Sequence, residues 1–469
     1  MKKTILTSTL ILFISISVFG QLYYKTISAG SEFSMAIRSD STLFAWGFNG
    51  NGQLGINNTT TQHSPVIVDS NSKWIAVSAG AWHCLAIKAD GSLWAWGLNT
   101  QGQLGDGTVV QRNQPTQIGT DTDWKMVEAG QAHSMALKSD STLWAWGYNT
   151  AGSVGDSTTV NKLIPTAIAP NKKWISISAG GAHSLAIDKS GALYAWGDNT
   201  VHQLGDSTTT QRITPTQIGS DNNWEEVSAG FQFSTALKNN HTIWSWGFNG
   251  NAQLGDGTTT NVLQPKQIGS ETNWKMIIAG ASFGFALKND STLWGWGYNG
   301  QGQLGTGDKL QKKIPIQIGD DADFVAVAAA EGFYYNGVYG LHTLALHTNR
   351  DVICATGANY IGQLGDGTTT TISSFNCNTG LITSIKEIVV DNKPFFNIYP
   401  NPSDGVFTVS SNETIKTISV YDSYGRLVKQ NTVNELTTKL SITEMVSGIY
   451  FVQVETENSV SSQKVVLQK

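Results

Sequence analysis

Short runs of strand-forming residues recur along the chain, separated by Gly, Asn, Asp and Ser. One copy of the pattern, residues 124–168, has four such runs, at residues 124–127, 133–138, 142–146 and 165–168. No stretch shows a helical period of useful length. Side chains alternate along a strand, so Leu143 and Ala145 should face one way and Trp144 and Trp146 the other. A sheet with one slim and one bulky apolar face has to be covered on both sides.

The pattern repeats with a period of 50 residues. Ala-Trp-Gly or a close variant recurs six times, and a degenerate Ala-Thr-Gly ends at Gly357. The aligned positions in the seven copies are Trp46, Trp96, Trp146, Trp196, Trp246, Trp296 and Thr356. Four strands per copy are typical of a propeller blade, and seven copies lie in the usual range for closed propellers. The predicted fold class is all-β: a seven-bladed β-propeller followed by a small β-sandwich domain.

These residues resemble the RCC1-like (regulator of chromosome condensation) repeat family. The motif stands here as Gly130, His133-Ser134-x-Ala136-Leu137 and Leu143-Trp144-Ala145-Trp146-Gly147-x-Asn149. A Gln-Leu-Gly element follows in six copies, beginning at Gln53, Gln103, Gln203, Gln253, Gln303 and Gln363. The resemblance implies a seven-bladed propeller over residues 21–380. It implies no single activity, because the family includes nucleotide exchange factors, photoreceptors, accessory domains and secreted inhibitors.

The first 20 residues have the features of a secretory signal peptide. Two lysines precede an apolar run over residues 5–19, and Gly20 gives a small residue near a cleavage point. The run is too short for a transmembrane segment. We therefore expect an exported protein.

The composition changes after about residue 390. Residues 381–395 are a predicted linker, and residues 396–469 a predicted β-sandwich. The segments Tyr399-Pro400-Asn401-Pro402, Tyr421-Asp422-x-x-Gly425-Arg426 and Gly448-Ile449-Tyr450-Phe451-Val452 resemble the type A sorting domain of the type IX secretion system of Bacteroidota. The resemblance implies the type IX secretion machinery as a partner, and a secreted or cell-surface location reached through the periplasm. A plain β-sandwich binding module is the alternative, and whether the tail is removed stays open.

The charge of the chain argues against nucleic acid as a partner. The net charge is −5, only 14% of the residues are charged, and no basic run occurs. The loops are rich in Thr, Asn, Gln and Ser, which suits contacts with a protein or a glycan.

The chain has three cysteines. Cys354 and Cys377 fall on neighbouring predicted strands, and the sequence leaves open whether they form a disulfide. Cys84 is expected to be a buried, small apolar residue.

Two repeated residue types could suggest metal binding. One register holds Phe33, His83, His133, His183, Phe233, Phe283 and His342, and another holds Asp106, Asp156, Asp206, Asp256 and Asp366. Phenylalanine replaces histidine in three copies, and equivalent positions in such a ring lie too far apart for one ion. One Asp per loop offers few of the six to eight oxygens that calcium takes. We expect blade packing and turn capping, with no metal and no cofactor.

The best local candidate for a binding site is an insertion in the seventh copy, residues 331–340. It brings four aromatic residues and an asparagine between glycines; the candidate ligand-binding residues are Phe333, Tyr334, Tyr335, Asn336 and Tyr339. The alternative is that the loop folds over the channel or packs on the tail linker.

The sequence favours an exported, non-catalytic binding propeller with an extracellular protein or glycan ligand. No local catalytic motif occurs, although carboxylates on different blades would leave no local signature. The alternatives are a secreted inhibitor of an extracellular enzyme and a polysaccharide-acting enzyme. Nucleotide exchange ranks last, because no small GTPase is expected outside the cell.

Overall fold

The computed structural model describes residues 23–330, 341–348, 352–377, 396–422, 427–457 and 460–468. The chain divides into two compact units, Met1–Thr383 and Ser384–Lys469. Each is described by itself.

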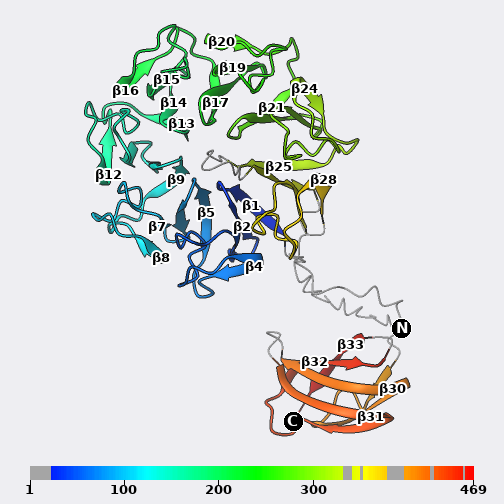
Figure 1. The fold of residues 1–469 in the computed structure, drawn as a ribbon. Coiled ribbons are helices and arrows are strands. Elements are labelled where there is room, and N and C mark those ends of the chain that lie inside the picture. The colour runs from blue at the N-terminus through cyan, green and yellow to red at the C-terminus, as the bar shows by residue number, and fades with distance from the viewer. Residues whose placement is uncertain are drawn as a thin grey trace, which may run out of the picture. The chain divides into compact units, whose positions relative to one another are not determined.

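The first unit is a ring of seven four-stranded antiparallel sheets (Figure 1). Each sheet consists of four strands that follow one another in the chain, and we number these blades 1 to 7 in chain order. The first strands of neighbouring blades pack together, so they surround the centre of the ring. The seven-bladed propeller predicted from the repeat is confirmed.

The strands of the blades fall into four sets from the centre outwards. The innermost are β1 (Tyr24–Ala29), β5 (Trp74–Ala79), β9 (Trp124–Ala129), β13 (Trp174–Ala179), β17 (Trp224–Ala229), β21 (Trp274–Ala279) and β25 (Phe324–Ala329). The second are β2 (Phe33–Arg38), β6 (His83–Lys88), β10 (His133–Lys138), β14 (His183–Asp188), β18 (Phe233–Lys238), β22 (Phe283–Lys288) and β26 (His342–His347). The third are β3 (Leu43–Gly47), β7 (Leu93–Gly97), β11 (Leu143–Gly147), β15 (Leu193–Gly197), β19 (Ile243–Gly247), β23 (Leu293–Gly297) and β27 (Ile353–Gly357). The outermost are β4 (Gln62–Val68), β8 (Arg112–Gln117), β12 (Lys162–Ile168), β16 (Arg212–Gln217), β20 (Val262–Gln267), β24 (Lys312–Gln317) and β28 (Ile372–Asn376).

The glycine that closes each third strand is required by the backbone. Gly147 has a φ of 93°, and a Cβ there would lie 2.7 Å from the carbonyl oxygen of Ala132. The other six equivalents also have positive φ, which side chains disfavour. This explains why glycine recurs at the position after the tryptophan.

Blades stack by placing a bulky face on a slim one. Trp146 of blade 3 is fully buried against Leu93 and Ala95 of blade 2. On the other side of the same strand, Leu143 and Ala145 pack with aromatic residues of blade 4. The alternation predicted for this strand is confirmed, and it makes each blade depend on both neighbours.

Hydrogen bonds repeat at each junction between blades. In the junction of blades 2 and 3, Trp146 Nε1 and Ser134 Oγ both donate to the carbonyl oxygen of Gln103, at 2.9 and 2.7 Å. Near the centre, the backbone N–H of Ala129 donates to Ser78 Oγ at 2.9 Å. In the junction of blades 1 and 2, Cys84 takes the serine position and its Sγ donates to Gln53 O at 3.2 Å. Buried Cys84 is therefore a joint residue as well as the small apolar group that the sequence predicts.

The ring closes through the same type of joint. Trp46 Nε1 and Ser34 Oγ of blade 1 donate to the carbonyl oxygen of Gln363 in blade 7, at 2.9 and 2.8 Å. At the rim, Gly367 N donates to His63 O at 3.0 Å. Blade 1 consists of β1 to β4 and blade 7 of β25 to β28, so neither borrows a strand from the other end of the unit.

Blade 7 departs from the repeat at the tryptophan position. Thr356 stands there, and its Oγ1 donates to the carbonyl oxygen of Gly302 at 2.9 Å. A Cβ at Gly305 would meet the ring of Phe375 at 2.6 Å, whereas the equivalent at Gly255 would meet Trp296. Phe375 on β28 thus fills the space that the indole fills elsewhere.

The second unit is one curled sheet around its own core. It contains β29 (Phe396–Tyr399), β30 (Val406–Asp422), β31 (Leu427–Ser441), β32 (Gly448–Glu455) and β33 (Val460–Leu467). The first half of β30 pairs with β29 and its second half with β32, while β31 pairs along its length. Inward residues of all five strands, among them Phe407, Ile418 and Val452, form one buried cluster. The predicted small all-β domain is confirmed, and the inner face of its single bent sheet encloses the core.

Candidate functional site

The aromatic insertion at residues 331–340 lies outside the described residues. Phe333, Tyr334, Tyr335, Asn336 and Tyr339 therefore remain predicted ligand-binding residues. The described part of the propeller shows what the other candidate residues do.

The repeated histidines belong to the joints between blades. His133 Nε2 lies 2.9 Å from Ser184 Oγ of the next blade, and His83 and His183 make the same contact at 3.0 Å. His342 closes the set with Ser34 of blade 1 at 2.7 Å. Burial lowers the pKa of His83, His133 and His183 to about 3, so these imidazoles are neutral at physiological pH. The expected packing role of the histidine register is confirmed.

The repeated aspartates organise their own loops. Asp106 Oδ1 accepts from the Thr108 backbone N–H and from Asn99 Nδ2, both at 3.0 Å. The same asparagine contact recurs at Asp156, Asp206, Asp256 and Asp366. Turn capping is confirmed, and these carboxylates are already engaged with donors on their own loop.

A lysine cage recurs at the end of the second strand in blades 2, 3, 5 and 6, and sequence reasoning missed it. Lys138 Nζ lies 4.9 and 5.0 Å from the ring centroids of Trp124 and Trp144, and it contacts Asp121 at 2.6 Å. Lys88, Lys238 and Lys288 take equivalent positions over pairs of tryptophans. The recurrence of a lysine five residues after the His/Phe position was the available signal. The cation–π contacts of each lysine connect the second strand to tryptophans on the first and third strands of the same blade.

Two carboxyl groups lie on the innermost strands, where most blades have small or apolar residues. Glu128 is on β9 and Glu226 on β17, in blades 3 and 5. The pKa of both is raised to about 8, mainly by burial, and the nearby charge of Glu226 contributes to the rise at Glu128. Both residues are half-buried, and they lie on strands that surround the centre of the ring. They stand in different registers, and each is the one charged residue of its own: Glu128 is the fifth residue of its strand, where the other blades have Ser, Ile or Ala, and Glu226 is the third, where they have Thr, Ala, Met or Ser.

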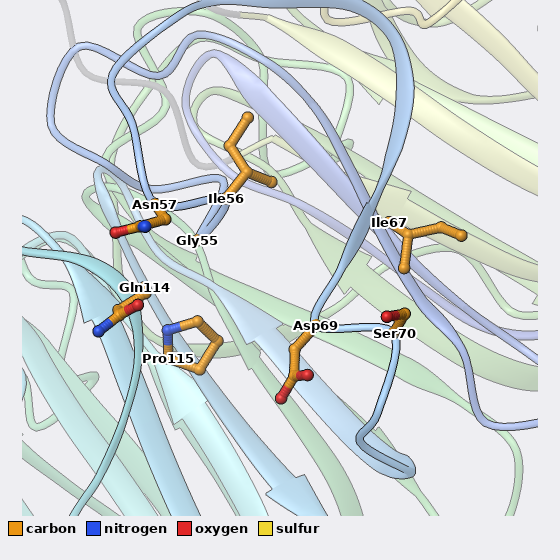
Figure 2. Close-up of a pocket in the computed structure, with 8 residues that line it drawn as sticks. All are labelled: Gly55, Ile56, Asn57, Ile67, Asp69, Ser70, Gln114 and Pro115. Atoms are coloured by element: carbon orange, nitrogen blue, oxygen red, sulfur yellow. The ribbon is translucent and has the colours of Figure 1, made fainter.

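The described surface also has grooves between the outer strands of adjacent blades. The groove between blades 1 and 2 has a volume of about 600 Å³ and is shown in Figure 2. Asn57, Gln114 and Pro115 lie on one side, and Ile67 and Asp69 on the other. Ile67 is 49% exposed. Amide, carboxylate and aliphatic groups thus face the same open space.

Grooves of the same kind lie at two further described junctions. The one between blades 4 and 5 has a volume of about 390 Å³ and is lined by Gln217, Asp221, Gln264 and Pro265. The one between blades 6 and 7, of about 450 Å³, includes His347, Phe375 and Cys377. The repeat therefore creates a series of similar grooves whose lining differs from blade to blade.

Cys354 on β27 and Cys377, which follows β28, form a disulfide. The sequence had placed them on neighbouring strands without deciding whether they were joined. Because export passes through oxidising compartments, the bond suits the route that the sequence predicts.

Together these features define a propeller whose repeated polar residues make contacts within or between its blades, followed by a separate small β domain. Residues 15–277 match the RCC1-like domain model, and residues 290–334 match the regulator of chromosome condensation (RCC1) repeat. The chain belongs to the RCC1-like domain family. Residues 397–468 match the secretion system C-terminal sorting domain, which identifies the second unit as a type IX sorting domain.

Solved structures support the fold. Human WBSCR16 is similar with a TM-score of 0.60 and 22% identity, over 66% of this chain and 84% of that one. Yeast RCC1 (Prp20), in a structure bound to Kap60, is similar with a TM-score of 0.59 and 19% identity, over 66% of this chain and 78% of that one. At these identities the likeness concerns the fold alone. Nothing matches the chain among curated proteins.

The sorting domain indicates export by type IX secretion, to the medium or the cell surface of a bacterium. The predicted signal peptide at residues 1–20 lies outside the described residues and remains a prediction. Within the described ranges, no helix is long and apolar enough to cross a membrane.

Proposed function

We propose that this protein is an exported, non-catalytic binding propeller that recognises an extracellular protein or a glycan. The sorting domain delivers the propeller, and one or more of its surface features bind the ligand.

The observation that supports this proposal is that the repeated polar side chains are engaged inside the propeller, whereas the side chains of one surface groove are open to solvent. The repeated histidines, aspartates and lysines make contacts within or between blades, as His133, Asp106 and Lys138 illustrate. The groove of Figure 2, in contrast, is open to solvent and combines hydrogen-bonding groups with apolar surface. Binding sites commonly have this combination, because apolar contact gives affinity and a few polar groups fix orientation.

The groove between blades 1 and 2 is the described candidate for the contact surface. Gln114 and Asp69 can bond to hydroxyl or peptide groups, while Ile67 and Pro115 can lie against a sugar ring or an aliphatic side chain. The aromatic insertion is the second candidate, from the sequence alone.

The test compares ligand capture by the full chain and three variants on a glycan array and on extracellular proteins. The first variant carries Ile67→Ser and Gln114→Ala in the groove of Figure 2. The second replaces Phe333, Tyr334, Tyr335 and Tyr339 with Ala. The matched control carries Gln217→Ser and Gln264→Ala in the groove between blades 4 and 5.

A ligand that the wild type and the control retain, and that one folded variant loses, would support the proposal and locate the site. A wild type that captures nothing in either format would contradict it.

The alternatives make different predictions. An inhibitor would form a stable one-to-one complex with an enzyme. A polysaccharide-acting enzyme would need carboxyl groups, for which Glu128 and Glu226 are the candidates, and substituting either with Gln would abolish turnover without unfolding the chain. Nucleotide exchange has no expected substrate outside the cell.

A further inference from the structure

We infer that blade 7 holds a thiolate–imidazole site for a soft divalent metal ion such as Zn²⁺, formed by His347, Cys354 and Cys377 when the disulfide is reduced. The ion and the disulfide would be alternative crosslinks at the same place.

The site occupies the position that the lysine cage takes in blades 2, 3, 5 and 6. In blade 6, Trp274 pairs with Lys288, and Ala286 with Trp294. In blade 7 the corresponding pairs are Phe324 with His347, and Ala345 with Cys354. An imidazole and a thiol therefore replace the ammonium and one indole of the cage.

The ligand atoms are already close together. A ring nitrogen of His347 and the sulfur atoms of Cys354 and Cys377 all lie within 4.8 Å of one another. Zinc bonds sulfur at about 2.3 Å and imidazole nitrogen at about 2.0 Å, so its tetrahedral ligands are roughly 3.5–4 Å apart. Reduction allows the two sulfurs to separate toward that spacing.

The surroundings fit a metal ligand. His347 Nδ1 contacts Asp323 Oδ1 at 2.6 Å, an arrangement in which a carboxylate fixes the tautomer and leaves Nε2 to ligate. Cys377 is exposed, and both it and His347 line the groove of about 450 Å³ between blades 6 and 7. An ion can thus enter from solvent, and a water molecule can fill the fourth position.

The chemistry balances with a dithiol as the reductant. The disulfide takes up two electrons and two protons to give two thiols, while the dithiol closes to its own cyclic disulfide. Zn²⁺ then binds as the two thiols lose their protons to solvent. Reoxidation of the thiolates by an external disulfide would release the ion.

The test is a Co²⁺ titration of the full chain under anaerobic conditions, before and after reduction, followed by displacement with Zn²⁺. The reduced wild type should develop thiolate-to-cobalt charge-transfer and tetrahedral d–d absorption at one ion per chain, and the oxidised protein should not. Cys377→Ser should remove about half of the charge-transfer intensity. Asp323→Asn should leave the spectrum in place and weaken Zn²⁺ binding roughly 10- to 100-fold.

Two further variants identify which side chains bind the ion. Cys84→Ser removes the third cysteine, which is buried in the joint of blades 1 and 2, and it should leave the spectrum unchanged. His347→Gln keeps both thiols and should alter the d–d bands while circular dichroism shows an intact fold. A reduced wild type without these bands, or a spectrum that Cys84→Ser abolishes, would overturn the inference.

Discussion

Trp46 Nε1 donates a hydrogen bond to the backbone carbonyl oxygen of Gln363 across 2.9 Å, and so connects two residues 317 positions apart. The same bond joins Trp146 to Gln103 between blades 2 and 3. Closure of the ring is therefore one more copy of an ordinary junction.

Replacement of Trp46 by Phe should lower the free energy of unfolding by roughly 2–3 kcal/mol, because it leaves a buried carbonyl with one donor fewer and a small cavity. Trp146→Phe is the matched control, and chemical denaturation measures both. Comparable losses are expected, since the two junctions are built alike. A negligible loss at Trp46 beside a large one at Trp146 would mean that the ends of the ring are not joined in this way.

The buried histidines should make the propeller less stable in mild acid. Their folded-state pKa is about 3, below the unfolded value near 6.5. The unfolded chain therefore binds more protons between these values, and the stability present above about pH 6.5 is lost as the pH falls toward 3.

Replacement of His133 by Phe should flatten this dependence, because Phe233 already occupies the same register in blade 5. Thermal unfolding from pH 4 to pH 7 measures the effect. Parallel curves for the wild type and the variant would show that His133 is not a source of the acid sensitivity.

The carboxyl groups on the innermost strands should act in the opposite pH range. The folded-state pKa of Glu128 is about 8, above the unfolded value near 4.3. The folded protein therefore keeps this proton at pH values where the unfolded chain releases it. The contribution to stability is fully present below about pH 4.3 and is lost as the pH rises through 8. Glu128→Gln should therefore stabilise the protein at pH 9 by up to about 4 kcal/mol more than at pH 5.

Denaturation midpoints at the two pH values test this prediction. Asp320→Asn, at an exposed position before β25, is the control variant. A Glu128 variant that gains as much at pH 5 as at pH 9 would contradict a buried, titrating carboxyl group.

The lysine cage should contribute to stability in each blade that has one. Lys138→Met removes a cation held between Trp124 and Trp144 and paired with Asp121, and it should cost about 1–2 kcal/mol. Lys125→Met, at an exposed position on β9, should be close to neutral. If the contacts of Lys138 with the tryptophan rings outweigh its ion pair with Asp121, high salt should reduce the loss of stability in Lys138→Met only slightly. Denaturation with and without salt measures this loss.

The candidate sites differ in how far the sequence could foresee them. The roles of His133 and Asp106 followed from counting, because one histidine or aspartate per blade cannot surround an ion. Glu128 and Glu226 were missed because they lie on different strands about 100 residues apart and share no local motif. The groove of Figure 2 could not be predicted either, since its lining combines residues of blade 1 with Gln114 and Pro115 of blade 2.

The sequence by itself determined the repeating unit, the number of blades and the two-part organisation of the chain. It did so because alternating side chains, invariant turn glycines and a fixed period act locally, as Gly147 and its six equivalents illustrate. Only the tertiary structure decided how the ring closes through Trp46 and Gln363, how Phe375 replaces a missing indole, and which partner each buried polar group takes. Those contacts join residues far apart in the chain, and their formation depends on packing between blades that no local pattern records.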